Sequence, residues 1–588
     1  MSLDGWLTLI IIAAVVVVMA REKLSPTAAV LGGTILLMLV GVIDAEQAFS
    51  GFSNQAPLTI AALYVVAAAV TRTGILRAPL TKTLASAKTE RQALARLLPG
   101  VAAGSSILNN TPIVAMLVPE VSSWAVRTGR SPSRYLMPVS FAAISGGLIT
   151  LIGTSTNLVV SGLLEAATGE GLGFFEITPV GLPVAAVTVG LLTLTTGKLL
   201  RDHRTPLEEL EEGLREFVVE MHVVPGGPLD GLSVEDGGLR HLKGVYLAAL
   251  ERPNGDVRVV ESGTRLAGGD RLRFVGKADE VVDLLSMPGL TSAHADQIDG
   301  FDLVRSDFFE AVIGPSSSLV GTTLKEARFR TAFLGAVVAI HRAGQRIDAK
   351  LGEVPLRTAD TLVILADSGF LERHRDRSDF LLVSPLGAPT VTDPRHRLTV
   401  MVVGFSVLFL AGSGLLPILD TSLIAAGALV ALGVLTFGQA RDAVDLNVVV
   451  MVAASFGLAA AMDVSGLAAE IAALVVDGLG PLGSVGVLTG VILTTTLLTE
   501  LVSNAAAASV VFPIAFVTAQ SLGMDPHALA IAVAIGASSS FLTPIGYQTN
   551  MMVYGPGGYR YFDYIRLGAP LTIAMLVVSV TLINVFML

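Results

Sequence analysis

The chain contains two blocks of long apolar segments joined by short polar loops, residues 1–200 and residues 396–588. A segment of about 20 apolar residues is long enough to cross a bilayer as a helix. In each block one apolar stretch is longer and broken near its middle, at 91–127 in the first and at 481–520 in the second. The pattern predicts an all-α polytopic membrane protein with five transmembrane helices and one re-entrant hairpin in each half.

A short polar break interrupts each predicted hairpin at the same place. In the first, SSILNNTPIVAMLVP puts Asn110 nine residues before a proline, and in the second, ELVSNAAAASVVFP does the same for Asn504. A second break follows in each half, GTSTN ending at Asn157 and TPIGYQTN ending at Asn550. Backbone that stops inside a bilayer survives only in protein or beside a polar cavity. Matched breaks in two halves therefore point to a transporter's binding site.

The basic residues give the two halves opposite orientations. Lys and Arg mark the cytoplasmic side of a membrane, and they follow the third segment at Arg72, Arg77 and Lys82. The loops on the other side are acidic, as at Glu165 and Glu170 and in the outer loop expected after the span 447–465, with Asp463, Glu470 and Asp477. The last span is expected at 567–588. We therefore expect both termini outside, residues 201–395 in the cytoplasm, and an inverted repeat in the membrane.

Composition excludes several classes of function. The 588 residues are 52% hydrophobic, 15% charged and include no cysteine, which rules out disulfides and thiolate metal sites. A net charge of −10 argues against a nucleic-acid partner. No GxxxxGK[ST] motif occurs, and the one GxGxxG match, GLGPLG at 478–483, lies between apolar membrane segments and not after a strand of a βαβ unit. We therefore expect neither an ATP-driven pump nor a dinucleotide enzyme. We predict no catalytic residues and no organic cofactor.

The central block shows strand-like alternation and repeats itself. It predicts two tandem α+β modules, 201–300 and 301–395, in which GVYLAALER and GAVVAIHR occupy equivalent places. The block resembles the TrkA-C (RCK-C) domain through Pro315, Ser316, Ser318, Leu319, Gly321, Gly269, Asp270 and Leu272. That resemblance implies a regulatory, often dimeric module with a small nucleotide as a candidate ligand. A cytoplasmic spacer that aids dimerisation is the alternative.

The membrane halves resemble the divalent anion/sodium symporter family. The resemblance rests on NNTP, GTSTN, SNA and TPIGYQTNMMVYGPGGY. It implies a homodimer, in the inner membrane of a bacterium, whose transport region moves across the bilayer like an elevator and carries sodium ions with a small divalent anion.

The same resemblance implies the site residues. Sodium would be held at two sites by Asn109, Asn110, Gly153 and Asn157 and by Ser503, Asn504, Gly546 and Asn550. The anion would meet Asn110, Thr111, Ser503, Asn504, Thr156 and Thr549. Sodium is a hard cation that prefers oxygen ligands, which asparagine, serine and free carbonyls supply. A dianion suits N–H donors at the starts of half-helices.

One departure from the family bears on the substrate. The second tip commonly carries threonine where this chain has Ala505, so a hydroxyl for one end of a dicarboxylate is missing. Sulfate is favoured modestly over succinate, and a sodium/dicarboxylate symporter is the alternative. A TrkA-C-gated ion channel and a non-transporting sensor are the other classes considered. Glu500 lies one turn before Asn504 inside an apolar segment, and the sequence supports a functional role and a structural role for it about equally.

Overall fold

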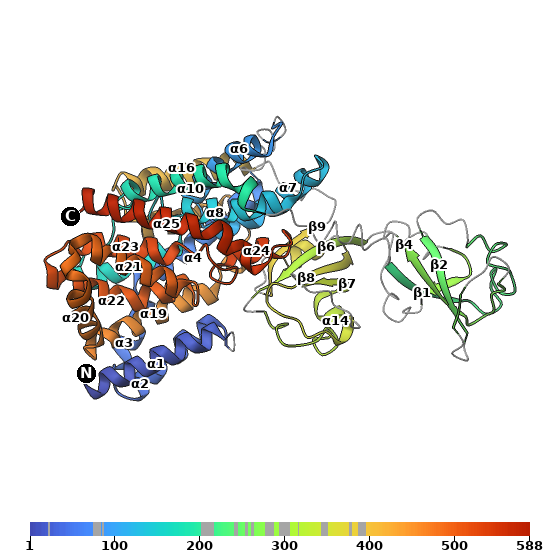
Figure 1. Cartoon of the computed structure of the whole chain (residues 1–588), viewed down its shortest axis with the longest axis horizontal. Coiled ribbons are helices and arrows are strands. Elements are labelled where there is room, and N and C mark those ends of the chain that lie inside the picture. Colours follow the sequence, from blue (N-terminus) through green and yellow to red (C-terminus); the bar gives the residue numbers. More distant parts are fainter. Residues whose placement is uncertain are drawn as a thin grey trace.

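The computed structural model places a helical membrane part beside two small sheet-containing modules (Figure 1). The described residues are 1–21, 24–74, 84, 87–200, 217–239, 245–252, 257–259, 264–276, 287–292, 306–314, 317–342, 351–367, 369–374, 379–385 and 396–588. Among them, six helical segments are long and apolar enough to cross a membrane. Both termini lie at the end of the membrane part away from the modules (Figure 1), and we call the two ends the terminus end and the module end.

The described helices of the first half alternate long apolar elements with short connecting ones. They are α1 (Leu3–Ala20), α2 (Pro26–Leu39), α3 (Ala45–Phe49), η1 (Ser50–Ser53), α4 (Gln55–Thr73), α6 (Glu90–Ser105), α7 (Asn110–Arg127), η2 (Pro132–Arg134), α8 (Leu136–Gly146), α9 (Ser155–Thr168) and α10 (Thr178–Leu199).

The second half follows the same order of elements. Its helices are α16 (Arg397–Gly412), α17 (Ile418–Ala431), α18 (Phe437–Ala443), α19 (Leu446–Val464), α20 (Leu467–Leu479), η7 (Gly480–Leu482), α21 (Gly483–Thr499), α22 (Asn504–Leu522), α23 (Pro526–Ser538), α24 (Gln548–Tyr554) and α25 (Tyr561–Phe586). The two predicted hairpins fall on α6–α7 and on α21–α22. The two later polar breaks separate α8 from α9 and α23 from α24.

Two expectations from the sequence differ from the structure. The acidic stretch after α19, expected to be an outer loop, forms helix α20, because its apolar and acidic residues recur at helical spacing. Leu467, Ala468 and Ala472 are buried while Glu470 and Asp477 are exposed. The last span was expected from residue 567, but α25 already begins at Tyr561.

The two modules are built on one plan. The first sheet has the strand order β3-β2-β4-β1-β5 and the second β7-β8-β6-β9, with antiparallel pairing throughout. The strands are β1 (Phe217–Val223), β2 (Val245–Glu251), β3 (Val257–Val259), β4 (Arg271–Gly276), β5 (Leu290–Ser292), β6 (Ser306–Ile313), β7 (Gly335–His341), β8 (Thr361–Asp367) and β9 (Phe380–Pro385). The second module adds the short helices α14 (Phe329–Phe333), η5 (Leu351–Glu353) and α15 (Phe370–His374).

A buried ion pair recurs in the two modules, ninety residues apart. Arg252 Nη1 lies 2.9 Å from Asp270 Oδ2 in the first, and Arg342 Nη2 lies 2.6 Å from Asp360 Oδ2 in the second. Each arginine also donates to the backbone carbonyl five residues before its aspartate, that of Arg265 in the first module and of Pro355 in the second. Of the TrkA-C resemblance residues, Pro315 and Ser316 lie outside the described part of the chain.

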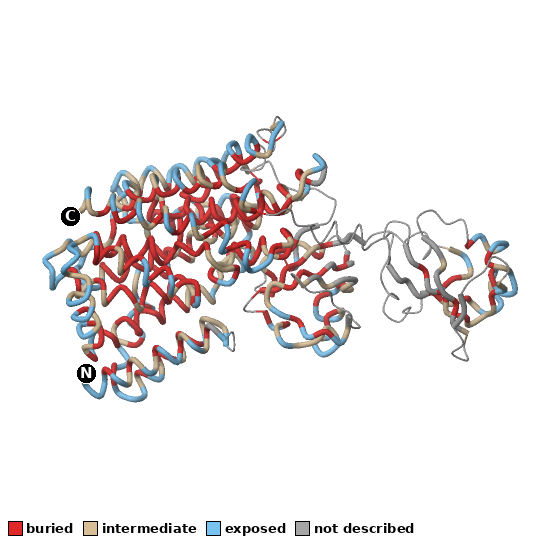
Figure 2. Tube along the Cα trace, in the orientation of Figure 1, coloured by how far each residue is buried: buried red, intermediate tan, exposed pale blue. Residues whose placement is uncertain are grey.

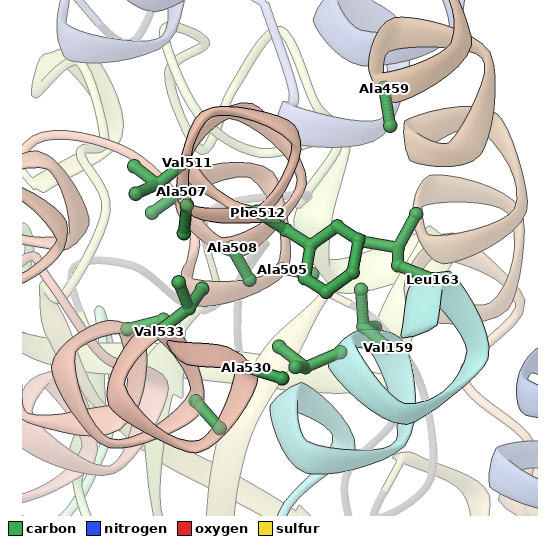
Figure 3. Packing of buried hydrophobic residues seen from close by; sticks show 14 of the residues in the cluster. Val159, Leu163, Ala459, Ala505, Ala507, Ala508, Val511, Phe512, Ala530 and Val533 are labelled. Atoms are coloured by element: carbon green, nitrogen blue, oxygen red, sulfur yellow. The ribbon is translucent and has the colours of Figure 1, made fainter. Parts of the chain in front are cut away.

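The buried core runs through the middle of the membrane part (Figure 2), and the asparagines of both hairpin tips, Asn110 and Asn504, are buried. Around the second tip it is made of small residues. Ala505, Ala507 and Ala508 of α22 face α23 and α9, and Phe512 fills the space next to Val159 and Leu163 (Figure 3). Alanine at these positions allows the helices to approach closely, so the tip of the second hairpin is held tightly.

Candidate functional site

Each hairpin tip is closed by one hydrogen bond to its asparagine. Ser105 Oγ donates to Asn110 Oδ1 at 2.5 Å, and Thr499 Oγ1 donates to Asn504 Oδ1 at 2.8 Å. In both cases the hydroxyl lies five residues before the asparagine. All four residues are buried, so these bonds satisfy polar groups that neither lipid nor a helix ladder could satisfy.

Each later break is also bridged by its asparagine. Asn157 Nδ2 donates to the carbonyls ten and seven residues earlier, at 3.1 and 3.0 Å. Asn550 Nδ2 makes the same two bonds at 2.9 and 3.1 Å. The two asparagines, which the sequence singled out as cation ligands, thus hold the non-helical backbone of their breaks in shape.

The tips and breaks pack directly together. A methyl group on Gly147 would come within 2.6 Å of Asn110 Oδ1, so only glycine fits between the first tip and its break. The first tip also contacts the second break, because Asn110 Nδ2 donates to the Tyr547 hydroxyl at 2.9 Å and Thr111 Oγ1 to Gln548 Oε1 at 3.3 Å. Hairpin and break from different halves therefore form one unit.

The carboxylate of Glu500 is buried and fully hydrogen-bonded within the protein. Its carboxylate accepts hydrogen bonds from Leu542 N at 2.7 Å, Thr543 Oγ1 at 2.8 Å and Ser540 Oγ at 3.2 Å. The side chain is only 7% exposed, and it does not line the cavity described below. Three donors make a buried carboxylate tolerable, so Glu500 ties the second hairpin to the second break.

The two halves differ in which buried side-chain atoms of their tips and breaks have no hydrogen-bond partner. Asn157 Oδ1 is buried and has no hydrogen-bond partner within the protein, and the same holds for Asn109 Oδ1 at the first tip. At the second break, Asn550 Oδ1 accepts from Ser140 Oγ at 2.7 Å. At the second tip the group without a partner is a donor, Asn504 Nδ2. The first half therefore offers free amide oxygens, and the second offers a free N–H group.

A cavity of about 180 Å³ lies between the two tips, and Val320 and Thr358 of the second module are among the residues that line it. Liquid water occupies about 30 Å³ per molecule, so the space suits a small solvated ion. Five predicted site residues line it, namely Asn109, Thr111, Ser503, Asn504 and Gly546. Among its described lining residues there is no lysine or arginine and one carboxylate, Asp445. Burial raises the pKa of Asp445, against the backbone N–H bonds from Val448 and Asn447.

The other predicted site residues lie behind the cavity wall and do not line it. They are Asn110, Gly153, Thr156, Asn157, Thr549 and Asn550. Thr549 instead accepts a hydrogen bond from Ser140 Oγ at 2.9 Å. The residues one position earlier, Ser155 and Gln548, face the cavity. No sequence pattern distinguishes these two residues from the neighbouring threonines, because the choice depends on where α9 and α24 begin.

Comparison with known proteins identifies a transporter family. Residues 14–536 match the family model described as the citrate transporter, CitMHS. A Chlamydomonas reinhardtii protein named for the sulfur deprivation response is 34% identical over 96% of this chain and 98% of its own length. An uncharacterized transporter of Synechocystis is 33% identical over 97% of this chain and 95% of its own.

More distant relatives carry more specific names. The sodium/sulfate cotransporter 1 of Chlamydomonas reinhardtii is 24% identical over 98% of this chain and 89% of its own. The solved structure of the Alcanivorax borkumensis YdaH transporter covers 99% of the chain at 14% identity and a TM-score of 0.42, too low to support a conclusion. Together, the family match and the full-length relatives show that this chain is an integral membrane transporter, not an enzyme, and belongs to the citrate transporter family.

Proposed function

We propose that the protein is a secondary transporter that moves a small divalent anion, sulfate in the first place, together with sodium ions. The two hairpins and two breaks form the transport unit, in an inverted repeat that alternates between the two sides of the membrane by an elevator-type movement. In this proposal the modules are cytoplasmic TrkA-C domains, the termini lie outside, and the protein works as a homodimer.

The observation that carries the proposal is the pair of free oxygens at the first tip. Asn109 Oδ1 and Asn157 Oδ1 belong to the tip and the break of one half, and neither has a partner. An unpaired buried acceptor costs about 1–3 kcal/mol. A sodium ion, which prefers oxygen ligands, would remove that cost. The same chemistry explains an anion site without arginine or lysine, since bound sodium supplies the positive charge.

The anion would lie between the starts of two long helices. α7 begins at Asn110 and α22 at Asn504, and residues next to both starts line the cavity. The first backbone N–H groups of a helix have no partner within it, and they carry partial positive charge. Asn504 Nδ2, which has no partner, adds a side-chain donor, whereas the hydroxyls of Thr111 and Ser503 line the cavity but donate to Gln548 Oε1 and Met451 Sδ. This arrangement suits a compact oxyanion surrounded by donors.

Sulfate is preferred over a dicarboxylate for two reasons. Relatives of full length are named as sodium/sulfate cotransporters. In addition, Ala505 lines the cavity and provides no hydroxyl for a second carboxylate. The family model is described as a citrate transporter, so a dicarboxylate or tricarboxylate remains the second candidate.

Labelled sulfate uptake into proteoliposomes tests the proposal. We expect uptake to require an inward sodium gradient, and unlabelled sulfate to compete better than succinate. Ala505→Thr should narrow that difference by about tenfold, the equivalent of one hydrogen bond near 1.4 kcal/mol. Succinate outcompeting sulfate in the unchanged protein would replace sulfate by the dicarboxylate, and uptake that is independent of sodium would remove the coupling. Electrical recording of channel-like currents would favour the gated channel instead.

A further inference from the structure

One glycine follows each break asparagine by five residues, Gly162 after Asn157 and Gly555 after Asn550. Gly162 lies on α9 toward the terminus end, and Gly555 ends α24 toward the module end. The surroundings of these two glycines report how the site is closed at each end of the membrane part.

At the terminus end the glycine is covered by the start of α4. A methyl group on Gly162 would lie 2.7 Å from Asn54 Oδ1, 3.1 Å from Ala56 Cβ and 3.0 Å from the Phe456 ring. Asn54 Nδ2 donates to the Gly162 carbonyl at 3.4 Å. Ala56 is buried at 5% exposure. Direct packing of α4 on α9 thus closes this end.

At the module end the equivalent helix start does not cover its glycine. α19 begins after Asp445 as α4 begins after Asn54, and each follows a short helix with a capping box. Asp445 and Asn447 line the cavity, together with Tyr64. Gln548 and Met551 of α24 line the same cavity, so cavity space lies between α24 and the start of α19, and these two helices do not close this end against each other.

The second module takes the place beside Gly555. A methyl group on Gly555 would contact the Thr361 hydroxyl and lie 3.5 Å from Thr361 Cβ and 3.6 Å from the Ala359 carbonyl. Thr358 and Val320 of the same module line the cavity. The turn 358–361 of the module thus stands against α24 where the start of α4 stands against α9.

An apolar contact holds the module in this place. Val312 of β6 and Leu382 of β9 are buried in the same hydrophobic cluster as Met552 of α24 and Val118 of α7. On β6, the neighbouring residues Ala311 and Ile313 point to the module's own core. One face of the sheet therefore builds the module, and the other is docked on the transport unit (Figure 1).

We propose that the second module is a wedge that holds the module-end mouth open, so that transport requires turn 358–361 to withdraw. Closing that mouth would bring Gly555 against Asp445 and Asn447, as Gly162 lies against Asn54 and Ala56, and the turn occupies this space. A signal that undocks the module then speeds transport. The inference rests on the proposed function for its transport readout, and on the cavity alone for its accessibility readout.

A disulfide lock tests the wedge directly. The chain has no cysteine, and Cβ atoms at positions 361 and 555 lie 3.5 Å apart, a distance that suits a disulfide. In the Thr361→Cys/Gly555→Cys protein, the threonine hydroxyl that would crowd residue 555 is also gone. We expect oxidation to slow uptake at least about tenfold, because the open state is fixed, and reductant to restore it. Each single variant serves as the control. An oxidised double variant that transports at the reduced rate would overturn the proposal.

Accessibility of the mouth gives a second test that needs no transported anion. Asn447→Cys places a thiol at the mouth, and a membrane-impermeant maleimide measures its exposure. Undocking by Leu382→Glu should slow labelling at least about threefold, because the mouth then closes part of the time. Lys325→Glu, on an exposed part of the same module, should leave labelling unchanged. If Leu382→Glu slows labelling but the protein does not take up sulfate, the wedge proposal stands and sulfate is rejected as the substrate. Equal labelling in a folded Leu382→Glu protein, with uptake intact, would reject the wedge alone.

Discussion

The two halves share the hydrogen bonds that hold their tips and breaks, and they differ in which polar groups remain without a partner. In both halves a hydroxyl closes the tip on its asparagine, and the later asparagine bridges its break to two carbonyls. Beyond these bonds the halves diverge. Asn110 Nδ2 is bonded to Tyr547, whereas Asn504 Nδ2 has no partner, and Asn157 Oδ1 has none, whereas Asn550 Oδ1 is bonded to Ser140.

This difference has a local cause in single residues. Tyr547 is long enough to reach Asn110, while the equivalent residue of the first break is Thr154. Ser140 supplies a hydroxyl to Asn550, while the equivalent position on α23 is Val533. Repeated bonds therefore define the scaffold. In the proposed function, the positions where the repeat is broken would divide cation and anion binding between the halves.

The largest effect should come from removing the tip asparagines, whose hydrogen bonds are common to both halves. Asn110→Ala and Asn504→Ala each remove the hydrogen bond that closes a tip on its asparagine, so we expect sodium-dependent uptake to fall at least about a hundredfold. Thr489→Ala, on a half-buried part of the second hairpin away from the tip, is the matched control and should transport normally. Wild-type uptake by both tip variants, at normal protein yield, would contradict the site.

Removing the carboxylate of Glu500, which has no equivalent at the matching position of the first half, should lower the stability of the protein. Glu500→Gln provides a single acceptor for three donors and turns an amide N–H toward them, so the thermal midpoint should fall by an amount corresponding to about 1–3 kcal/mol. The equivalent residue in the first half is Ser106, and Ser106→Ala should change the midpoint far less. Equal midpoints for Glu500→Gln and the unchanged protein would show that the three bonds contribute little.

Ser140→Ala makes the second break resemble the first. Asn550 Oδ1 then loses its donor and becomes free to bind a cation, so the sodium concentration for half-maximal uptake should fall about two- to fivefold. The variant should also unfold at a slightly lower temperature in sodium-free buffer, since a buried hydrogen bond contributes about 1 kcal/mol. An unchanged sodium dependence would mean that the oxygen of Asn550 is not part of a sodium site.

The smallest effect should come from the cavity residues that the sequence did not single out. Ser155→Ala and Gln548→Ala remove polar groups that face the cavity. Each should raise the sulfate concentration for half-maximal uptake by about two- to tenfold, the range of one modest hydrogen bond. Thr156→Val and Thr549→Val, behind the wall, should act through stability instead. Competition binding of sulfate checks this assignment. A larger loss of sulfate affinity in Thr156→Val and Thr549→Val than in Ser155→Ala and Gln548→Ala would reverse it.

The sequence was sufficient to locate the tips and breaks and insufficient to orient their side chains. Asn110 and Asn504 could be found because a polar residue inside an apolar hairpin is rare, and its repetition rarer. Ser155 and Gln548 could not be separated from Thr156 and Thr549, because one residue of difference in the start of a helix turns a side chain by about 100°. The Ser140–Asn550 bond joins residues 410 positions apart, and no local pattern announces it.

The contact of turn 358–361 with α24 could not be predicted either. It is a packing of surfaces from separate domains, and neither surface is unusual in sequence. The amphipathic helix α20 was missed for a different reason, because its two acidic residues resemble those of a loop when the helical period is not considered.

The bond between Asn110 and Tyr547 has a consequence for how the protein is made. Its partners are 437 residues apart, and both modules are synthesised between them. At about 5–20 residues per second, the first hairpin waits roughly 20–90 s for the break that completes it. During that time its polar tip faces a bilayer that offers no hydrogen bonds. The nascent first half therefore needs temporary protection by the insertion machinery, and the second module has time to fold before the mouth it occupies exists.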